Sequence, residues 1–318
     1  MELAFGPVPS RRLGRSLGVN NIPDKVCTYA CVYCQIGNTL SMEIERRKFY
    51  EPEEIRDAVA EKITRGVDYI TFVPDGEPTL DANLGRTAEL LREFGVKLAI
   101  ITNSSLLYRE DVRNELMRFD YVSLKLDAVS EMLWRFVDRP HKSLSLDSIL
   151  AGMLDFASEF KGTLVTETML IDGVDYEVEI KKLAEFLGEL KPEVAYIGVP
   201  TRPPAEKWVK PADEYTVSMA YEEFSRITRV EYLTGFEGTE FSSTGNFEED
   251  LMSITAVHPM REDAVFELMR RCGATEEDLQ ELIDDGKLIV GEYEGHRYYM
   301  RALPSRRWMQ NNQDIEVK

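Results

Sequence analysis

The feature that most constrains the fold is the alternation of short apolar segments with longer amphipathic segments between residues 16 and 227. The apolar segments predict strands at Ser16–Asn20, Asp68–Val73, Val96–Thr102, Tyr121–Leu126, Leu164–Ile171 and Val194–Val199. The amphipathic segments predict helices at Pro52–Arg65, Leu84–Phe94, Arg109–Arg118, Leu146–Phe160, Val178–Leu190 and Asp213–Ile227. Such alternation gives a parallel sheet with right-handed crossovers. Six strands predict an α/β fold, a partial (β/α)6 barrel, with functional groups at the C-terminal ends of the strands.

Composition shifts divide the chain into two unequal units. Residues 1–237 contain the predicted barrel, and residues 238–257 mix Gly, Ser, Thr and acids, which predicts a linker. Residues 258–303 resemble a winged helix, with helices at Arg261–Cys272 and Thr275–Asp285 followed by a hairpin of Leu288–Tyr293 and His296–Met300. Residues 304–318 show no packing pattern and are expected to be disordered.

The charge distribution restricts the partners. The net charge is −19, which disfavours a general affinity for phosphate backbones. The segment from Thr275 to Gly286 carries six acids and no Lys or Arg, so a recognition helix there would repel DNA. We therefore expect the second unit to contact protein or present substrate. Residues 1–50 are an exception, with seven Lys or Arg against four acids, so a local basic face beside the cysteines is possible.

Three cysteines lie in one short segment. Cys27, Cys31 and Cys34 have the spacing C-x3-C-x2-C, and the remaining cysteine, Cys272, is more than two hundred residues away. Thiolates are the ligands of iron–sulfur clusters, and a cubane held by three of them has one open iron that can bind a small molecule. Zinc in a structural site normally takes four protein ligands, and a disulfide framework does not suit so long a chain.

Polar residues follow the second and third predicted strands. Asp75-Gly76-Glu77 places a glycine, which permits close backbone approach, beside carboxylates that could accept hydrogen bonds from an ammonium group. Thr102-Asn103-Ser104 follows an apolar strand and suits ribose or carboxylate groups, although helix capping by Ser104 or Ser105 is an equal alternative. For Asp75-Gly76-Glu77 the alternative interpretation is a plain surface turn.

The later strands offer further candidates. Lys125 and Asp127 share one strand face, and a buried lysine there would need a carboxylate partner or a ligand carboxylate. On the fifth strand either Thr166 and Thr168 or Glu167 and Met169 face the ligand, and Thr168 is the candidate for cofactor binding. Gly198 could lie against an adenine. Arg202 could bind an anionic part of the substrate, or be a solvated residue of a proline-stiffened loop.

Several segments together resemble a known family. The cysteine segment, the lead-in Gly6–Val19, Asp75–Leu80, Lys125–Asp127 and Thr201–Pro204 look like the radical S-adenosylmethionine (SAM) proteins grouped with the wyosine-base synthases. The resemblance covers about residues 5–235. Wyosine synthases act on tRNA and carry further cysteines for a second cluster, which this chain lacks.

The resemblance implies cofactors and site residues. Cys27, Cys31 and Cys34 would hold a [4Fe–4S] cluster whose open iron binds SAM, and Asp75-Gly76-Glu77 would hold the SAM amino group. Further cofactor-binding candidates are Thr102, Asn103, Ser104, Lys125, Thr168 and Gly198; catalytic candidates are Lys125, Asp127 and Arg202. An external ferredoxin- or flavodoxin-like electron donor is implied. The radical that SAM cleavage generates would abstract hydrogen from a substrate, which can be a tRNA base, a protein side chain or a small metabolite.

Two rival interpretations remain. The chain could be a non-catalytic redox sensor that uses the cluster and the second unit to bind nucleic acid, or a zinc-stabilised scaffold. No segment reaches the roughly 18 apolar residues that a membrane span needs, and the N-terminus lacks the pattern of a signal peptide. We therefore expect a cytoplasmic protein without membrane contact, in a reducing compartment where thiolates survive as metal ligands.

Overall fold

The computed structural model describes residues 2–234, 241, 243 and 245–306, and its largest element is an eight-stranded sheet. The order is β1 (Ala4–Ser10), β2 (Gly14–Val19), β5 (Tyr69–Phe72), β6 (Lys97–Thr102), β7 (Tyr121–Lys125), β8 (Thr163–Met169), β9 (Val194–Gly198) and β10 (Arg229–Leu233). The β1–β2 pair is antiparallel and every other neighbouring pair is parallel. The strands β1 and β10 end the sheet without pairing to each other, which confirms an open barrel.

All six predicted strands are present, and the sheet has two more. The edge strand β1 contains Pro7 and Pro9, and the first strand predicted from the sequence is the following one, Ser16–Asn20. Proline is compatible with a sheet edge, because an edge strand need not donate every ladder hydrogen bond. The strand β10, Arg229–Leu233, is short and mostly not buried, so it lacks an apolar strand signal.

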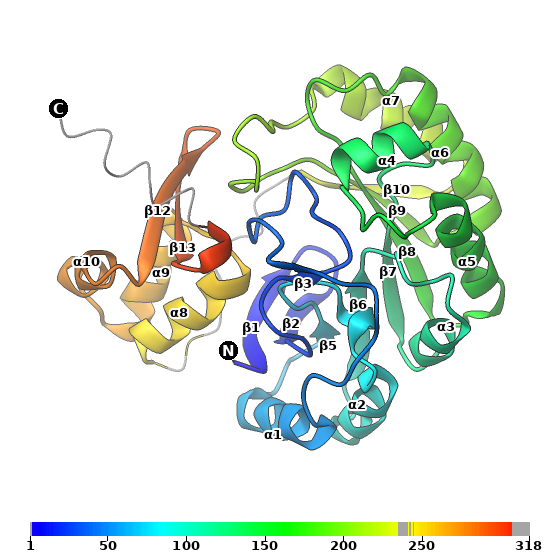
Figure 1. Ribbon diagram of the computed structural model, residues 1–318. Coiled ribbons are helices and arrows are strands. Elements are labelled where there is room, and N and C mark those ends of the chain that lie inside the picture. Colours follow the sequence, from blue (N-terminus) through cyan, green and yellow to red (C-terminus); the bar gives the residue numbers. More distant parts are fainter. Residues whose placement is uncertain (1, 235–240, 242, 244, 307–318) are drawn as a thin grey trace.

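Helices cover the outer face of the sheet (Figure 1). They are α1 (Pro52–Lys62), α2 (Leu84–Leu91), α3 (Glu110–Leu116), α5 (Leu146–Glu159), α6 (Glu177–Leu190) and α7 (Glu214–Ser225), as predicted apart from their ends. The short helix α4 (Glu131–Val137) and the 3-10 turns η1 (Pro78–Leu80) and η2 (Arg92–Phe94) were not predicted. The main core lies between the helices and the sheet, where Phe72, Val122 and Leu124 pack with Ile55 and Ile180.

Strand register sorts side chains between the helix layer and the barrel interior. Lys125 of β7 pairs with Glu167 of β8, and Leu124 pairs with Thr166. Since paired residues share a face and Leu124 belongs to the core under the helices, Thr166 and Thr168 face that layer. Lys125 and Glu167 therefore face the interior of the barrel, together with Asp127.

The C-terminal unit has its own small core and sheet. Its elements are α8 (Phe247–Val257), β11 (Met260–Arg261), α9 (Glu262–Cys272), α10 (Glu276–Asp284), β12 (Leu288–Tyr293), β13 (His296–Arg301) and the 3-10 turn η3 (Pro304–Arg306). The antiparallel sheet has the order β11-β13-β12. Apolar side chains of its helices and strands, including Leu251, Val265 and Tyr299, form the core.

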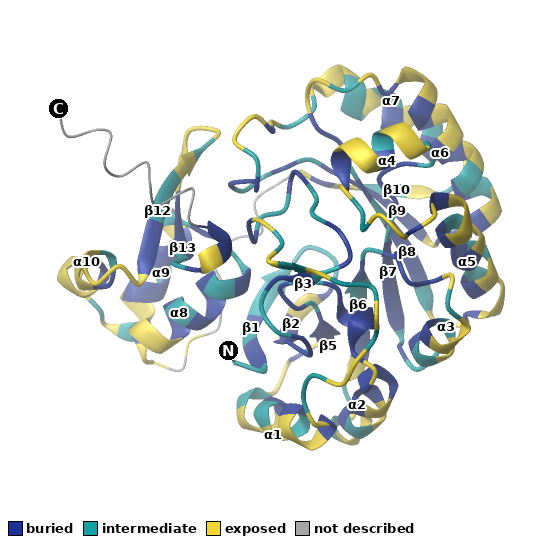
Figure 2. Ribbon diagram, viewed as in Figure 1, coloured by how far each residue is buried: buried dark blue, intermediate teal, exposed yellow. Residues whose placement is uncertain are grey.

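Two predictions about this part of the chain were wrong. Residues 247–257, read as linker, form helix α8, because Asn246 caps its N-terminus and Phe247, Leu251 and Ile254 form a buried face. The turn Pro304–Arg306, read as part of a disordered tail, is ordered, and both Ser305 and Arg306 are buried (Figure 2). Residues 307–318, and 235–240 of the presumed boundary, lie outside the described residues.

The C-terminal unit lies against the open edge of the barrel (Figure 1). Helix α8 contacts β1, where Val8 packs against the small core and Ser253 donates a hydrogen bond to Glu2. A covered edge strand cannot pair with another chain. Among the described residues, no helix combines the length and the apolar character that crossing a membrane would require.

Candidate functional site

The three clustered cysteines lie in the loop between two short parallel strands, β3 (Val26–Cys27) and β4 (Ser41–Met42). All three thiols are free and partly buried. The loop is tight, since the Cys34 amide donates to the Cys31 carbonyl at 3.1 Å, and the Gly37 amide donates to the Cys34 carbonyl at 3.1 Å. The loop therefore places three sulfur ligands in one region above the strand ends.

The fourth cysteine is elsewhere. Cys272 ends helix α9, and its sulfur lies 3.0 Å from the Ser243 hydroxyl and 3.8 Å from a carboxylate oxygen of Asp250. In the described part of the chain, no three His, Cys, Asp or Glu side chains form a group suited to a single metal ion. A cubane is a different case, because each thiolate binds its own iron. The donor set of the loop, three thiols without Cys272, fits a cluster with one open iron.

A side-chain hydrogen-bond donor lies beside each of two sulfurs. The Lys25 ammonium lies 3.1 Å from Cys34 Sγ, and the Asn103 amide nitrogen lies 3.6 Å from Cys27 Sγ. Such donors tune the reduction potential of iron–sulfur clusters. Burial raises the pKa of the Cys27 thiol to about 11, although the nearby Lys25 ammonium lowers it. Binding a cluster therefore requires release of thiol protons.

Sequence reasoning missed Lys25. Its backbone is in the left-handed region with φ 57°, and only 2 % of the residue is exposed. Its amide donates to the Asp75 carbonyl at 2.9 Å, and its carbonyl accepts from the amides of Leu40 and Ser41. Its position two residues before Cys27 was the available signal, but a lone lysine carries no pattern. Lys25 joins the cysteine loop to the end of strand β5.

The segment after β5 supports the loop through its backbone. A Cβ atom on Gly76 would collide with the Val26 carbonyl, so glycine is required here by the cysteine loop itself. The Glu77 carboxylate is buried and accepts hydrogen bonds from Thr79, from the Thr102 hydroxyl at 2.6 Å and from the Asn103 amide at 2.8 Å. The side chain of Glu77 therefore ties the segment after β5 to β6, while its amide donates to the Val26 carbonyl at 3.2 Å.

The neighbouring Asp75 is buried beside a cation. Its Oδ1 has no hydrogen-bond partner, and burial raises the pKa of its carboxyl to about 7, against the opposing charge of Arg306. Burial also disfavours the charged form of Arg306 and lowers the pKa of its guanidinium to about 10. Arg306 donates to the carbonyls of Thr255, Ala256 and Arg301. The C-terminal unit thus brings a buried cation close to the segment predicted to bind SAM.

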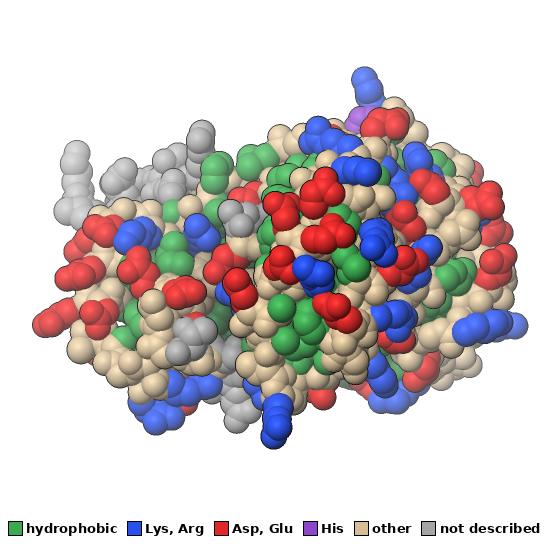
Figure 3. Space-filling view, turned by 90° about the horizontal axis from the view of Figure 1, so that it is seen from below, with side chains coloured by type: hydrophobic (Ala, Val, Ile, Leu, Met, Phe, Trp, Pro, Cys, Tyr) green, Lys and Arg blue, Asp and Glu red, His purple; other side chains and the backbone are tan. Residues whose placement is uncertain are grey.

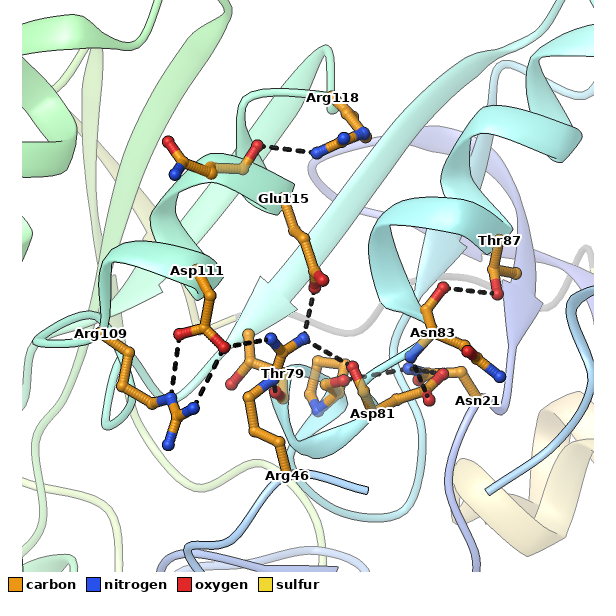
Figure 4. A network of polar contacts seen from close by, with 12 residues as sticks. Asn21, Arg46, Thr79, Asp81, Asn83, Thr87, Arg109, Asp111, Glu115 and Arg118 are labelled. Atoms are coloured by element: carbon orange, nitrogen blue, oxygen red, sulfur yellow. Dashed lines mark hydrogen bonds and ion pairs between the residues drawn. The ribbon is translucent and has the colours of Figure 1, made fainter. Parts of the chain in front are cut away.

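An arginine network fixes the turn that follows (Figure 4). Arg46 donates to the carbonyls of Thr79 and Asp81 at 2.8 and 2.7 Å, and forms ion pairs with Asp111 and Glu115 of helix α3. Only 6 % of its side chain is exposed. The network holds turn η1, whose N-cap residue is Glu77, against α3.

The polar residues after β6 are also largely committed to the protein. The Thr102 hydroxyl accepts from the Ser104 amide at 3.1 Å, and the Ser104 hydroxyl donates to the Lys125 carbonyl at 2.9 Å. Asn103 differs, because its side chain reaches the cysteine loop and also donates to Thr28 at 2.7 Å. Of these three candidates, Asn103 is the one whose side chain contacts a predicted cluster ligand.

Inside the barrel, charged side chains form a continuous network of contacts. The Lys125 ammonium lies 3.1 Å from Glu167 and 3.6 Å from Asp127, and 4.8 Å from the centre of the Tyr33 ring. Arg12 pairs with the other oxygen of Glu167. Although burial raises the pKa of Glu167, Arg12 and Lys125 lower it to about 2. The expectation that Lys125 needs a carboxylate partner is confirmed.

This network of side chains extends to the cysteine loop. Tyr33 donates a hydrogen bond to Asp127 and lies 3.3 Å from Asp138, whose carboxylate is 3.5 Å from Cys31 Sγ. Burial raises the pKa of Asp138 well above its usual range. Lys125 and Asp127 are thus placed on a path between the barrel interior and the cluster ligands.

Two remaining candidates on β8 and β9 have different surroundings. Thr168 faces the helix layer and donates to the Leu126 carbonyl at 2.8 Å, so its hydroxyl is bonded to the protein backbone, and a role in binding SAM stays a prediction. A strand of alternating polar residues does not reveal which set faces inward. Gly198 ends β9, and a Cβ there would meet Met169 only at ordinary contact distance, so close backbone approach does not require glycine.

Arg202 lies between the cysteine loop and the C-terminal unit. Its guanidinium donates to the side-chain oxygen of Gln35, the residue after Cys34, and lies 3.2 Å from Nε2 of His258. The alternative of a purely solvated arginine is excluded by these contacts. Arg202 is separate from the Lys125 network, so the candidate catalytic residues occupy two places.

Comparison with known proteins agrees with this arrangement. Residues 22–187 match the family model of the radical SAM superfamily, so the chain belongs to that superfamily and is an enzyme of this class. Members of the superfamily bind a [4Fe–4S] cluster and SAM. Over 314 residues, the chain is 49 % identical to UPF0026 protein MJ1312 of Methanocaldococcus jannaschii, covering 96 % of this chain and 98 % of that protein.

Solved structures share the fold at low sequence identity. Streptococcus suis SuiB bound to S-adenosylmethionine superposes with a TM-score of 0.51 at 16 % identity, covering 68 % of this chain and 49 % of SuiB. TYW1 with a lysine-pyruvate adduct gives 0.51 at 17 % identity, covering 67 % of this chain and 74 % of TYW1. The chain therefore spans about half the length of SuiB. These likenesses confirm the radical SAM fold predicted from the sequence.

Proposed function

We propose that Cys27, Cys31 and Cys34 hold a [4Fe–4S] cluster whose open iron binds SAM, and that the enzyme abstracts hydrogen from a substrate. The supporting observation is that three free thiols of one loop lie beside Lys25 and Asn103, with Cys272 remote. When bound, the reduced cluster supplies the electron that cleaves SAM to methionine and a 5′-deoxyadenosyl radical. Superfamily membership favours this enzyme over the redox-sensor and zinc interpretations.

The protein's own groups then have distinct roles. The backbone of Asp75-Gly76-Glu77 binds the SAM ammonium group, because the Glu77 carboxylate is already occupied by four donors. Thr102 and Ser104 hold this segment and its neighbour in place. Lys125, neutralised by Glu167 and Asp127, orients a carboxylate of SAM or substrate, with Asp127 fixed by the Met169 amide at 2.7 Å. Gly198 remains a candidate for contact with the adenine.

The partners follow from the same chemistry. An external ferredoxin- or flavodoxin-like protein supplies electrons, and the winged-helix-like C-terminal unit presents or covers the substrate. Acidic and basic side chains are interspersed over the face seen in Figure 3, without one large basic patch there. Together with the net charge of −19, this surface favours a small metabolite or a protein side chain over tRNA.

Anaerobic reconstitution tests the proposal. The chain is loaded with iron and sulfide, reduced with dithionite and mixed with SAM, and 5′-deoxyadenosine is measured by liquid chromatography. We expect about four irons per chain and formation of the nucleoside that depends on both reductant and SAM. A fully loaded cluster that yields no 5′-deoxyadenosine under these conditions would contradict the proposed function.

A further inference from the structure

A cavity of about 280 Å³ lies where the barrel meets the C-terminal unit. One wall comes from the segment after strand β9, including Thr201 and Arg202. The other comes from His258 and Arg261 and from the β12–β13 hairpin, including His296. This position, at the C-terminal ends of the barrel strands, is where barrels of this kind bind their substrates.

Direct contacts between the two units build the cavity. The Tyr298 hydroxyl donates to the Thr201 carbonyl at 2.7 Å, and the Tyr293 hydroxyl lies 3.5 Å from the Pro200 carbonyl. The His258 ring packs edge-on against Phe241, with ring centres 5.2 Å apart. Each unit supplies part of the lining, so neither forms the cavity alone.

Most charged or titratable side chains of the lining are basic. Arg202, Arg261, His258 and His296 line it, with Glu294 as the acidic member. Arg261 is held in place by Asp263 at 2.8 Å, which fixes its guanidinium beside the cavity. The whole chain has three histidines, and two of them are here. In a chain of net charge −19, such a gathering of donors marks a place for an anion.

The cavity is linked to the cysteine loop. Arg202 lines it and donates at the same time to Gln35, which directly follows Cys34. A ligand group bound by Arg202 would therefore be held by a side chain that also contacts the cysteine loop. That placement suits a substrate that must be presented to a radical generated at the cluster.

We propose that this cavity binds the anionic group, a phosphate or a carboxylate, of a small-molecule substrate. The inference rests on the proposed radical SAM function, whose substrate it specifies. Arg202 comes from the barrel, and Arg261, His258 and His296 come from the C-terminal unit, which is thereby part of the substrate site. Ligand pockets commonly measure roughly 300–1,000 Å³, so a cavity of about 280 Å³ accepts a small molecule or one group of it rather than a folded RNA.

Histidine side-chain NMR tests the proposal directly. The full-length, anaerobically purified chain is titrated with inorganic phosphate and, separately, with succinate, at an ionic strength kept constant with sodium chloride. The chain has one further histidine, His141, which is not among the lining residues and serves as an internal control. We expect saturable shifts of the His258 and His296 signals with at least one anion, and no shift of His141. The tighter-binding anion identifies the group as phosphate or carboxylate.

Charge-removing variants provide the second measurement. Arg261→Gln and Arg202→Gln are each expected to weaken binding of the tighter anion about tenfold or more. Arg270→Gln is the control: Arg270 is an exposed arginine of helix α9, which does not line the cavity, so this variant should bind as the wild type does. If Arg202→Gln disturbs the cysteine loop, Arg261→Gln still tests the cavity, because Arg261 belongs to the C-terminal unit, where its guanidinium pairs with Asp263.

Two results would overturn the inference: no saturable shift of His258 or His296 with either anion, or unchanged affinity in both arginine variants. The titration needs neither reductant nor SAM. A failure of anion binding is therefore distinguishable from a failure of SAM cleavage, which is measured separately by nucleoside release.

Discussion

The Ser305 hydroxyl donates a hydrogen bond of 3.0 Å to the backbone carbonyl of Ile36, which joins the last described turn of the chain to the cysteine loop. The Asn38 amide returns a bond of 3.0 Å to the Ser305 carbonyl. Between them lies Gly37, with φ 91°. The C-terminal unit is therefore attached to the loop that carries Cys34, as well as to the edge of the barrel.

This attachment predicts a specific effect of Gly37→Ala. An added Cβ would collide with the Ser305 carbonyl, so the variant should loosen the cysteine loop and retain less iron after reconstitution. Gly95→Ala is the matched control, because Gly95 also has a positive φ, 66°, but open space around its Cβ. Iron per chain, measured after gel filtration, should fall for Gly37→Ala alone. Equal iron retention in the two variants would show that the contact does not support the loop.

The second prediction concerns the network of charged side chains inside the barrel. Glu167→Gln removes the shared partner of Arg12 and Lys125 and should destabilise the chain by about 3 kcal/mol at pH 7. The folded-state pKa of Glu167 is lowered to about 2, so its stabilising effect is complete above the unfolded value and is lost as the pH falls from about 4.5 towards 2.

Urea denaturation across this pH range, with the cluster-free chain in reducing buffer, measures the effect. The difference in unfolding free energy between wild type and Glu167→Gln should shrink steadily below pH 4.5. Glu159→Gln, at the exposed end of helix α5, serves as the control and should show no such difference. A gap that stays constant down to pH 2 would mean that the Glu167 charge does not stabilise the fold.

The third prediction concerns Asn103. Its amide nitrogen lies 3.6 Å from Cys27 Sγ, and donors near the sulfurs stabilise the more negative, reduced form of a cluster. Asn103→Leu should therefore shift the midpoint potential to more negative values while iron content stays close to that of the wild type. A redox titration followed by electron paramagnetic resonance measures the shift. Asn114→Leu, on helix α3, should leave the potential unchanged; a similar shift in both variants would refute the assigned role.

The sequence was sufficient for the parts of the fold that carry strong periodic signals. Buried strands such as Lys97–Thr102 and capped amphipathic helices were predictable, because apolar spacing reflects burial. The edge strand β1, with its two prolines, and helix α8, with three acids in its first turn, were not. Their stability depends on packing against each other across the two units, which a local pattern does not reveal.

The candidate site was predictable to a similar extent. The cysteine spacing and the pairing of Lys125 followed from chemistry that the residue types alone impose. The side of the sheet that Thr168 faces did not follow from the sequence. A shift of one residue along a polar strand exchanges the side chains that point inward with those that point outward. Lys25 and Ser305 were missed, since each contributes through a contact with a segment far away in the sequence, Lys25 with the Asp75 carbonyl and Ser305 with the Ile36 carbonyl.

The most direct measurement of the central claim compares the four cysteines. Cys27→Ser, Cys31→Ser, Cys34→Ser and Cys272→Ser are reconstituted anaerobically in parallel, and iron per chain and 5′-deoxyadenosine are quantified. We predict that each of the first three loses the cluster and nucleoside formation, while Cys272→Ser, whose sulfur contacts Ser243 and Asp250 away from the cysteine loop, matches the wild type. Full iron loading and nucleoside release in any one of the first three variants would contradict the account.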